Sequence, residues 1–298
     1  MSSKDLYSLG DFISDKSRII TNDEKEKIEA ARTTIIYFSD FCLFYYNLEK
    51  NTDSLIDFLD KLDKTNTLTE YNNRMLFADV NRITANFLSS FYSLIEFLER
   101  KISSFPTIKK IIYDNHFEYR LFYELRKYMT HQGFAITKIK TFLGKETINV
   151  KAIFDSNKLI ESKECNAKFR KELQAIENKD FILLKHAIEF KKTIKSLLQE
   201  IINHEGLAIK NAHSILSTER NKTSRDKGDC YLIKNEKPIW SLIRTLNTSL
   251  ERCYIGLLAG ENINLLQKNL SDEYVFFRQL CSIYYGNDNS VPTFVDIS

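Results

Sequence analysis

Glycine and proline are scarce in this chain, and that scarcity limits the folds it can adopt. Among 298 residues there are 8 Gly and 3 Pro. Sharp turns depend heavily on these two residues, so a turn-rich β architecture is disfavoured. Long helices are favoured instead, because Gly and Pro are the residues that most weaken a helix interior. We therefore expect a mainly α-helical protein built as a helical bundle.

Apolar residues recur at three- and four-residue steps along most of the chain, as in helices with one buried face. The clearest stripe consists of Phe77, Val80, Phe87, Phe91, Leu94 and Leu98. This spacing predicts helices over about 21–49, 53–61, 67–103, 114–133, 165–176, 183–201, 207–217, 239–258 and 271–285.

Several residues mark where these helices begin and end. Capping-box patterns predict two helix starts, at Thr21 with Glu24 and at Thr67 with Glu70. Pro106 is expected to end one helix and Asp114 to cap the next. Gly133 is well placed to stop the helix that Asp114 begins.

The periodicity changes between residues 136 and 160. Apolar and mostly polar residues alternate there at Ile148, Val150, Ala152 and Phe154. This pattern of period two predicts a small β-hairpin inserted in the bundle, with its turn at Gly144 and Lys145. A short strand is also expected at 231–233.

A polar segment at 221–229 (NKTSRDKGD) is the one candidate domain boundary. It would separate a helical bundle over 1–220, with its β insertion, from a C-terminal helical extension over 221–298 packed on that bundle. A single domain is the alternative.

Charge and cysteine content are those of an ordinary intracellular protein. The net charge is +3, from 43 basic and 40 acidic residues, which does not by itself indicate nucleic-acid binding. The five cysteines are far apart and form no CxxC pair, so we expect reduced thiols and a cytoplasmic location. No secretory signal is visible, and the most apolar run, 35–46, is too short to cross a bilayer.

Sequence motifs for bound cofactors are missing from the chain. It has no Walker or Rossmann glycine pattern, no nucleophile elbow and no HExxH. His186, His204 and His213 lack the spacing of zinc ligands, and His186 is better explained as a residue at the core edge. We therefore expect neither a cofactor nor a metal.

One pair of residues suggests chemistry. Arg126 and His131 form R-x4-H in the last two turns of the helix expected over 114–133. A guanidinium can bind phosphate oxygens, and an imidazole can transfer protons near neutral pH. Residues three and four positions from Arg126 include no carboxylate, so its charge has to be met by another helix, another chain or a ligand phosphate.

The segment 117–134 (FEYRLFYELRKYMTHQGF), after the aromatic helix that precedes it, resembles the motif helix of the HEPN superfamily. The similarity covers about residues 70–134, and Lys127 stands where many members have Asn. It implies a helical bundle and a metal-independent endoribonuclease that acts as a homodimer, with Arg126 and His131 as catalytic residues. It also implies a role in toxin–antitoxin or antiphage defence, with an antitoxin or other defence protein as partner.

If this resemblance holds, RNA is the substrate and Lys127, Tyr128, Thr130 and Lys138 are candidate substrate-binding residues. Lys140 would extend a basic track, whereas Tyr128 and Phe134 are as well explained by packing. Two alternatives stay open. One is a non-catalytic HEPN-like scaffold or a nucleotide- or protein-binding module. The other is a chance match, in which Arg126 pairs with a carboxylate and His131 caps a helix.

Overall fold

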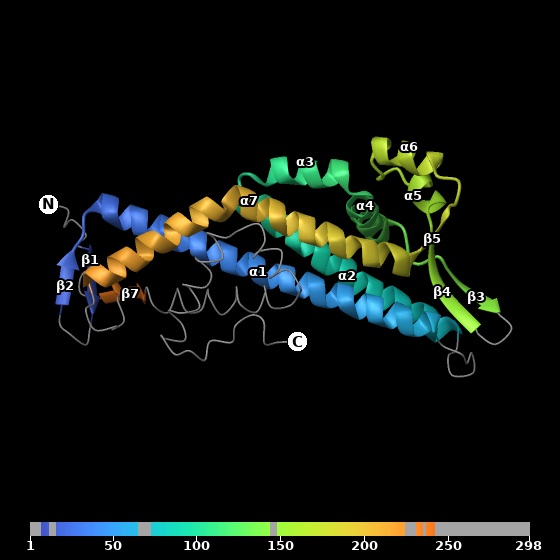
Figure 1. Ribbon diagram of the computed structural model, residues 1–298, viewed down its shortest axis with the longest axis horizontal. Helices are drawn as coiled ribbons and strands as arrows, with labels where there is room; N and C mark the ends of the chain where they lie inside the picture. The colour runs from blue at the N-terminus through green and yellow to red at the C-terminus, as the bar shows by residue number, and fades with distance from the viewer. Residues whose placement is uncertain are drawn as a thin grey trace. The chain divides into compact units, whose positions relative to one another are not determined.

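The computed structural model describes residues 7–11, 16–64, 73–143, 148–223, 231–234 and 237–241. In these ranges the protein is mainly α-helical with small β elements, which confirms the predicted fold class (Figure 1). The helices are α1 (Asn22–Asp63), α2 (Asn73–Lys101), α3 (Phe105–Asn115), α4 (Phe117–His131), α5 (Asn157–Glu161), α6 (Ala167–Ala175) and α7 (Leu183–Thr223). The strands are β1 (Tyr7–Asp11), β2 (Lys16–Ile19), β3 (Lys138–Leu143), β4 (Ile148–Asp155), β5 (Asp180–Ile182), β6 (Tyr231–Lys234) and β7 (Lys237–Ser241).

The chain divides into two compact units. One comprises Met1–Leu43 with Ile202–Ser298, and the other comprises Phe44–Ile201. The long helices α1 and α7 contribute residues to both. The boundary expected near residue 221 stays a prediction, because residues 224–230 and 242–298 lie outside the described ranges.

In the first unit, four strands form a sheet in the order β2-β1-β6-β7, with every neighbouring pair antiparallel. Leu9 on β1 and Leu232 on β6 face each other and are fully buried. The predicted capping box at the start of α1 is present. The Thr21 backbone N–H donates to a Glu24 carboxylate oxygen at 2.8 Å, and the Glu24 N–H donates to the Thr21 hydroxyl at 3.2 Å.

In the second unit, aromatic rings of α2, α4 and α7 form the core. Phe87 and Phe91 of α2 meet Phe190 of α7 edge to face, with ring centroids 5.3 and 5.0 Å apart. Phe122 of α4 completes the cluster at 5.0 Å from Phe87. From Val80 to Leu98 the apolar stripe predicted for α2 is therefore its buried face, whereas Phe77 is only half-buried. This face packs α2 against α4.

The predicted hairpin is present as β3 and β4, paired in register from Lys138 opposite Ile153 to Leu143 opposite Ile148. Its turn at Gly144 and Lys145 lies outside the described residues. Strand β5, which was not predicted, pairs antiparallel with β4 and completes a three-stranded sheet. Three residues are too few to give a recognisable alternation.

Several predicted helix boundaries were wrong. The segments 21–49 and 53–61 form one helix, α1. At the expected break, Thr52 is buried and its hydroxyl donates to the Leu48 carbonyl at 2.7 Å, so this polar side chain is accommodated inside the helix. The segments 183–201 and 207–217 likewise form one helix, α7.

The expected roles of Pro106 and Asp114 were also wrong. Pro106 lies in the first turn of α3, a helix that was not predicted, and α2 already ends at Lys101. Proline starts a helix readily, since its missing N–H would be unsatisfied there anyway. Asp114 lies within α3, and His116 is the capping residue before α4.

Near the C-terminus, residues 237–241 form strand β7, so a helix does not begin at Ile239. The strand predicted at 231–233 is present as β6. The loop predicted at 221–229 was wrong for its first three residues, because α7 continues to Thr223. Other expectations fall on residues outside the described ranges, namely the rest of that loop, the Thr67 capping box and the helices expected over 242–258 and 271–285.

Candidate functional site

Helix α4 carries the Arg126 and His131 pair on a well-anchored scaffold. Leu121, Leu125 and Tyr128 are buried on its inner face. The helix is regular as far as His131 and ends there, where the Gln132 N–H donates to the Tyr128 carbonyl at 2.8 Å. The pair therefore occupies the last two turns of this helix, as predicted.

Arg126 is half-buried, and its guanidinium carbon lies 5.2 Å from the centre of the Tyr92 ring on α2. This is cation–π geometry. Its buried Nε atom has no hydrogen-bond partner, and the guanidinium forms no ion pair with any residue that the structure describes. The sequence predicted that no carboxylate of α4 pairs with Arg126. In the structure, no carboxylate of the other described elements pairs with it either.

Arg120, six residues earlier on α4, has the opposite environment. It makes two hydrogen bonds to the Glu172 carboxylate, at 3.0 and 2.8 Å, and its side chain is 12% exposed. It also donates to the backbone carbonyls of Tyr113 and Asp114. Arg120 therefore uses its N–H groups to connect α3, α4 and α6, whereas the N–H groups of Arg126 make no hydrogen bond to a described residue.

His131 is exposed at the end of α4. Its side chain makes no hydrogen bond or ion pair within the described part of the chain. Five residues of a regular helix rotate by about 500°, so Arg126 and His131 point about 140° apart. One copy of α4 therefore does not aim both side chains at a single phosphate.

The predicted substrate-binding residues of α4 are engaged inside the chain. Lys127 donates to the carboxylate of Glu124, at 3.2 and 3.3 Å, and Glu124 is 1% exposed. Tyr128 is buried and packs edge to face on Phe154. The Thr130 hydroxyl donates to the Arg126 carbonyl at 2.9 Å. None of the three lies free beside Arg126.

Lys138 and Lys140 on β3 face carboxylates across the sheet. Lys138 Nζ lies 2.6 Å from an Asp180 oxygen and 3.7 Å from an Asp155 oxygen, and Lys140 is also bonded to Asp180. These hydrogen bonds lower the pKa of Asp180 and, from the Lys138 side, raise the pKa of that lysine. The carboxylates of Asp155 and Asp180 therefore largely neutralise the positive charge of the expected basic track.

A cation and tyrosine cluster beside Arg126 was not predicted. Tyr123 of α4 lies 6.4 Å from Tyr92, ring to ring. Lys109 of α3 lies over the Tyr123 ring at 4.7 Å and is paired with Glu99 at 2.6 Å, while Lys127 lies over the same ring at 4.8 Å. These residues come from three helices, so no local sequence pattern announces the cluster.

The histidines weighed as metal ligands lie apart. Burial lowers the pKa of His213 to about 4, His204 is exposed, and His186 Nδ1 lies 3.5 Å from a Glu118 oxygen. Among the described residues, no three His, Cys, Asp or Glu side chains gather as a metal site. Nor does any described helix have the length and apolar character needed to cross a membrane.

Comparison with known proteins adds no assignment. No family model, no curated protein and no solved structure matches this chain.

Proposed function

We propose that the protein is a metal-independent endoribonuclease of HEPN type, with Arg126 and His131 as its catalytic residues. The observation that carries the proposal is the state of Arg126. Its guanidinium is held over Tyr92, is half-buried and has no carboxylate among the described residues. A fixed cation in that state is suited to an anionic ligand, and the same helix carries the exposed imidazole of His131, which can transfer protons near neutral pH.

The proposed reaction needs no bound metal. His131 accepts the proton of a ribose 2′-hydroxyl, and the 2′-oxygen attacks the adjacent phosphorus. The bond from phosphorus to the 5′-oxygen then breaks, and that oxygen takes a proton from water as it leaves, while His131 returns its proton to the solvent. The products are a 2′,3′-cyclic phosphate and a 5′-hydroxyl. Arg126 stabilises the charge that grows on the phosphate oxygens in the transition state.

A second copy of the chain is part of this proposal. The two side chains diverge by about 140° on one helix, but two α4 helices related by a twofold axis can combine one Arg126 with the partner subunit's His131. Phe134, three residues beyond His131, is 66% exposed and meets Phe77 edge to face at 5.6 Å. An exposed ring beside the motif suits a contact between subunits.

The biological setting is part of the same proposal. A role in toxin–antitoxin or antiphage defence, a cytoplasmic location and an antitoxin or defence partner are supported only by the resemblance of residues 70–134 to HEPN proteins. The rival function is a non-catalytic scaffold or binding module. The internal engagement of Lys127, Tyr128 and Lys138 favours that rival, because three predicted RNA contacts already have partners.

Cleavage of RNA by the purified protein in the presence of EDTA tests the proposal. We expect Arg126→Ala and His131→Ala to abolish the formation of cyclic-phosphate ends while circular dichroism stays unchanged. Arg100→Ala is the matched control. Arg100 is exposed, and its polar contacts with described residues stay within α2: a hydrogen bond to the Glu96 carbonyl at 3.1 Å and an ion pair of 3.8 Å to the Glu96 carboxylate. Intact RNA after incubation with the wild-type protein, or equal cleavage by all variants, would favour the scaffold.

A further inference from the structure

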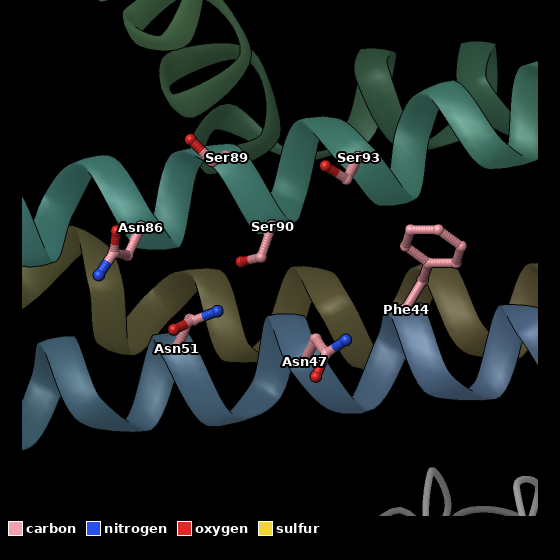
Figure 2. Close-up of a pocket in the computed structure, with 7 residues that line it drawn as sticks. All are labelled: Phe44, Asn47, Asn51, Asn86, Ser89, Ser90 and Ser93. Carbon is pink, nitrogen blue, oxygen red and sulfur yellow. The ribbon is translucent and has the colours of Figure 1, made fainter.

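A polar groove lies between α1 and α2 in the second unit, with a volume of about 340 Å³ (Figure 2). Its lining residues are Phe44, Asn47 and Asn51 from α1, and Asn86, Ser89, Ser90 and Ser93 from α2. None of them is charged. The volume lies at the lower end of the range for small-ligand sites.

The polar side chains of this groove are largely unused within the chain. Among the described residues, the side chains of Asn47, Asn51 and Asn86 make no hydrogen bond, and neither do those of Ser89 and Ser93. Ser90 alone donates, to the Phe87 carbonyl at 2.8 Å. Figure 2 shows the asparagines of α1 directed toward α2. Asn47, Asn86, Ser89 and Ser93 are exposed, so their polar groups are open to a ligand as well as to solvent. Asn and Ser are also poorer helix formers than Ala.

Phe44 forms the aromatic end of the groove. Its ring stacks on Phe97 with centroids 4.8 Å apart and planes inclined by 28°. Phe44 itself is half-buried and still lines the groove. The groove thus combines an aromatic surface with amide groups that present a donor and an acceptor together.

These features fit a flat, uncharged ligand with hydrogen-bonding edges. Asn pairs with the donor and acceptor edge of a nucleobase through both of its polar atoms, and unstacked bases bind on aromatic side chains. The absence of charged lining residues disfavours a phosphate or carboxylate inside the groove. A nucleobase meets all three conditions.

The groove and the Arg126 contact share one stretch of α2. Tyr92, which supports the Arg126 guanidinium, adjoins Ser93 in sequence and stands three residues after Ser89. At about 100° per residue, these three positions of α2 fall within an arc of about 100°. A strand whose phosphate meets Arg126 therefore passes the rim of the groove.

We propose that this groove binds an unpaired base of the single-stranded RNA whose phosphate contacts Arg126. The inference rests on the proposed function and adds to it a base-binding subsite formed by Asn51 and Asn86, with Phe44 at the other end of the groove. Under this proposal the groove, rather than the α4 motif, gives the protein its base preference, because Arg126 can bind a phosphate of any nucleotide.

Binding of labelled eight-nucleotide RNAs, measured by fluorescence anisotropy, tests this subsite. For Asn51→Ala and Asn86→Ala we expect binding of the preferred homopolymer to weaken about tenfold, the loss of one good base contact. Both changes put a stronger helix former into a helix, so the fold is retained. Asn115→Ala, at the exposed end of α3, is the control and should bind as the wild type does.

An RNA with one abasic position separates base binding from general binding. It should bind wild type more weakly, but lose nothing further with Asn86→Ala, because the two changes remove the same contact. Binding that depends on Arg126 but is unchanged by the groove variants overturns this inference and leaves the ribonuclease proposal standing. RNA binding that depends on both Arg126 and the groove residues, without any RNA cleavage, overturns the ribonuclease proposal and leaves this inference standing. A wild-type protein that binds none of the RNAs also overturns the inference.

Discussion

Two arginines on α4 have different roles: Arg120 is structural, whereas Arg126 is a cation available to a ligand. Arg120 is held by Glu172 and by two backbone carbonyls, whereas the guanidinium of Arg126 contacts only the face of Tyr92 among the residues that the structure describes. We expect Arg120→Met to lower the free energy of unfolding by about 2 kcal/mol, because several charge-assisted hydrogen bonds are lost. Arg126→Met should cost less than about 1 kcal/mol, since only the cation–π contact is removed.

Urea denaturation of both variants measures this difference. Methionine keeps the unbranched stem of arginine, so the packing of the aliphatic part is preserved in each case. An equal loss of stability in the two variants would make Arg126 a structural residue and would remove the main support for its catalytic role.

His213 predicts a pH dependence of stability. Burial lowers its pKa from 6.5 to about 4, so between these values the unfolded chain binds a proton that the folded chain does not. Stability is therefore greatest above about pH 6.5 and falls as the pH decreases toward 4. From pH 7.5 to pH 5, His213 should account for about 2 kcal/mol of lost stability.

Urea denaturation of wild type and His213→Gln at pH 7.5 and pH 5 isolates this contribution. His116, whose pKa is also lowered mainly by burial, is present in both proteins and cancels in the comparison. Glutamine does not titrate, so the variant should lose less stability on acidification than wild type. An identical loss in the two proteins would exclude His213 as the source.

At the scale of elements, α6 depends on a single capping side chain. The Asn166 side chain accepts hydrogen bonds from the Lys168 and Phe169 N–H groups, at 2.9 and 3.3 Å. We expect Asn166→Ala to destabilise the protein by about 1 kcal/mol and Asn166→Ser to retain most of the cap. Thermal unfolding checks this, with Asn115→Ala as the control. A neutral Asn166→Ala would mean that α6 is fixed by Arg120 and Phe169 packing instead.

The elements that the sequence predicts well are those whose buried faces have a clear period. The stripe from Val80 to Leu98 on α2 is buried, and so are Val150, Ala152 and Phe154 of the alternation on β4. Boundaries were less predictable, because Thr52 satisfies its hydroxyl inside α1 and Pro106 begins a helix. Such outcomes depend on hydrogen bonds and packing that a linear pattern does not contain.

The candidate site was predictable only in part, for a similar reason. The positions of Arg126 and His131 on α4 follow from the sequence, as does the lack of a carboxylate three or four positions from Arg126 on that helix. The partners of the lysines do not, since Asp180 lies on another strand 42 residues beyond Lys138. The residues of the polar groove come from two helices that are far apart in the sequence, and Asn and Ser are common on helix surfaces. No local sequence pattern therefore predicts the groove.

At the scale of the whole molecule, the geometry of α4 makes oligomeric state the deciding property. The helix is regular through His131, so a distorted last turn does not bring the pair together. The proposed activity then requires two copies, and the protein is expected to be a dimer in light scattering at the concentrations where it cleaves RNA. A monomer at those concentrations would contradict the shared site.

Mixing two inactive variants tests whether the site is shared between copies. A heterodimer of Arg126→Ala and His131→Ala chains has one site that lacks both groups and one that has an intact Arg126 from one copy and the partner subunit's His131. If subunits exchange at random, half the dimers are mixed and half of their sites are intact, so activity should return to about a quarter of wild type. Mixing either variant with itself is the control and should restore nothing. A mixture of the two variants that stays inactive, although exchange is demonstrated with differently tagged chains, would show that each copy uses its own pair.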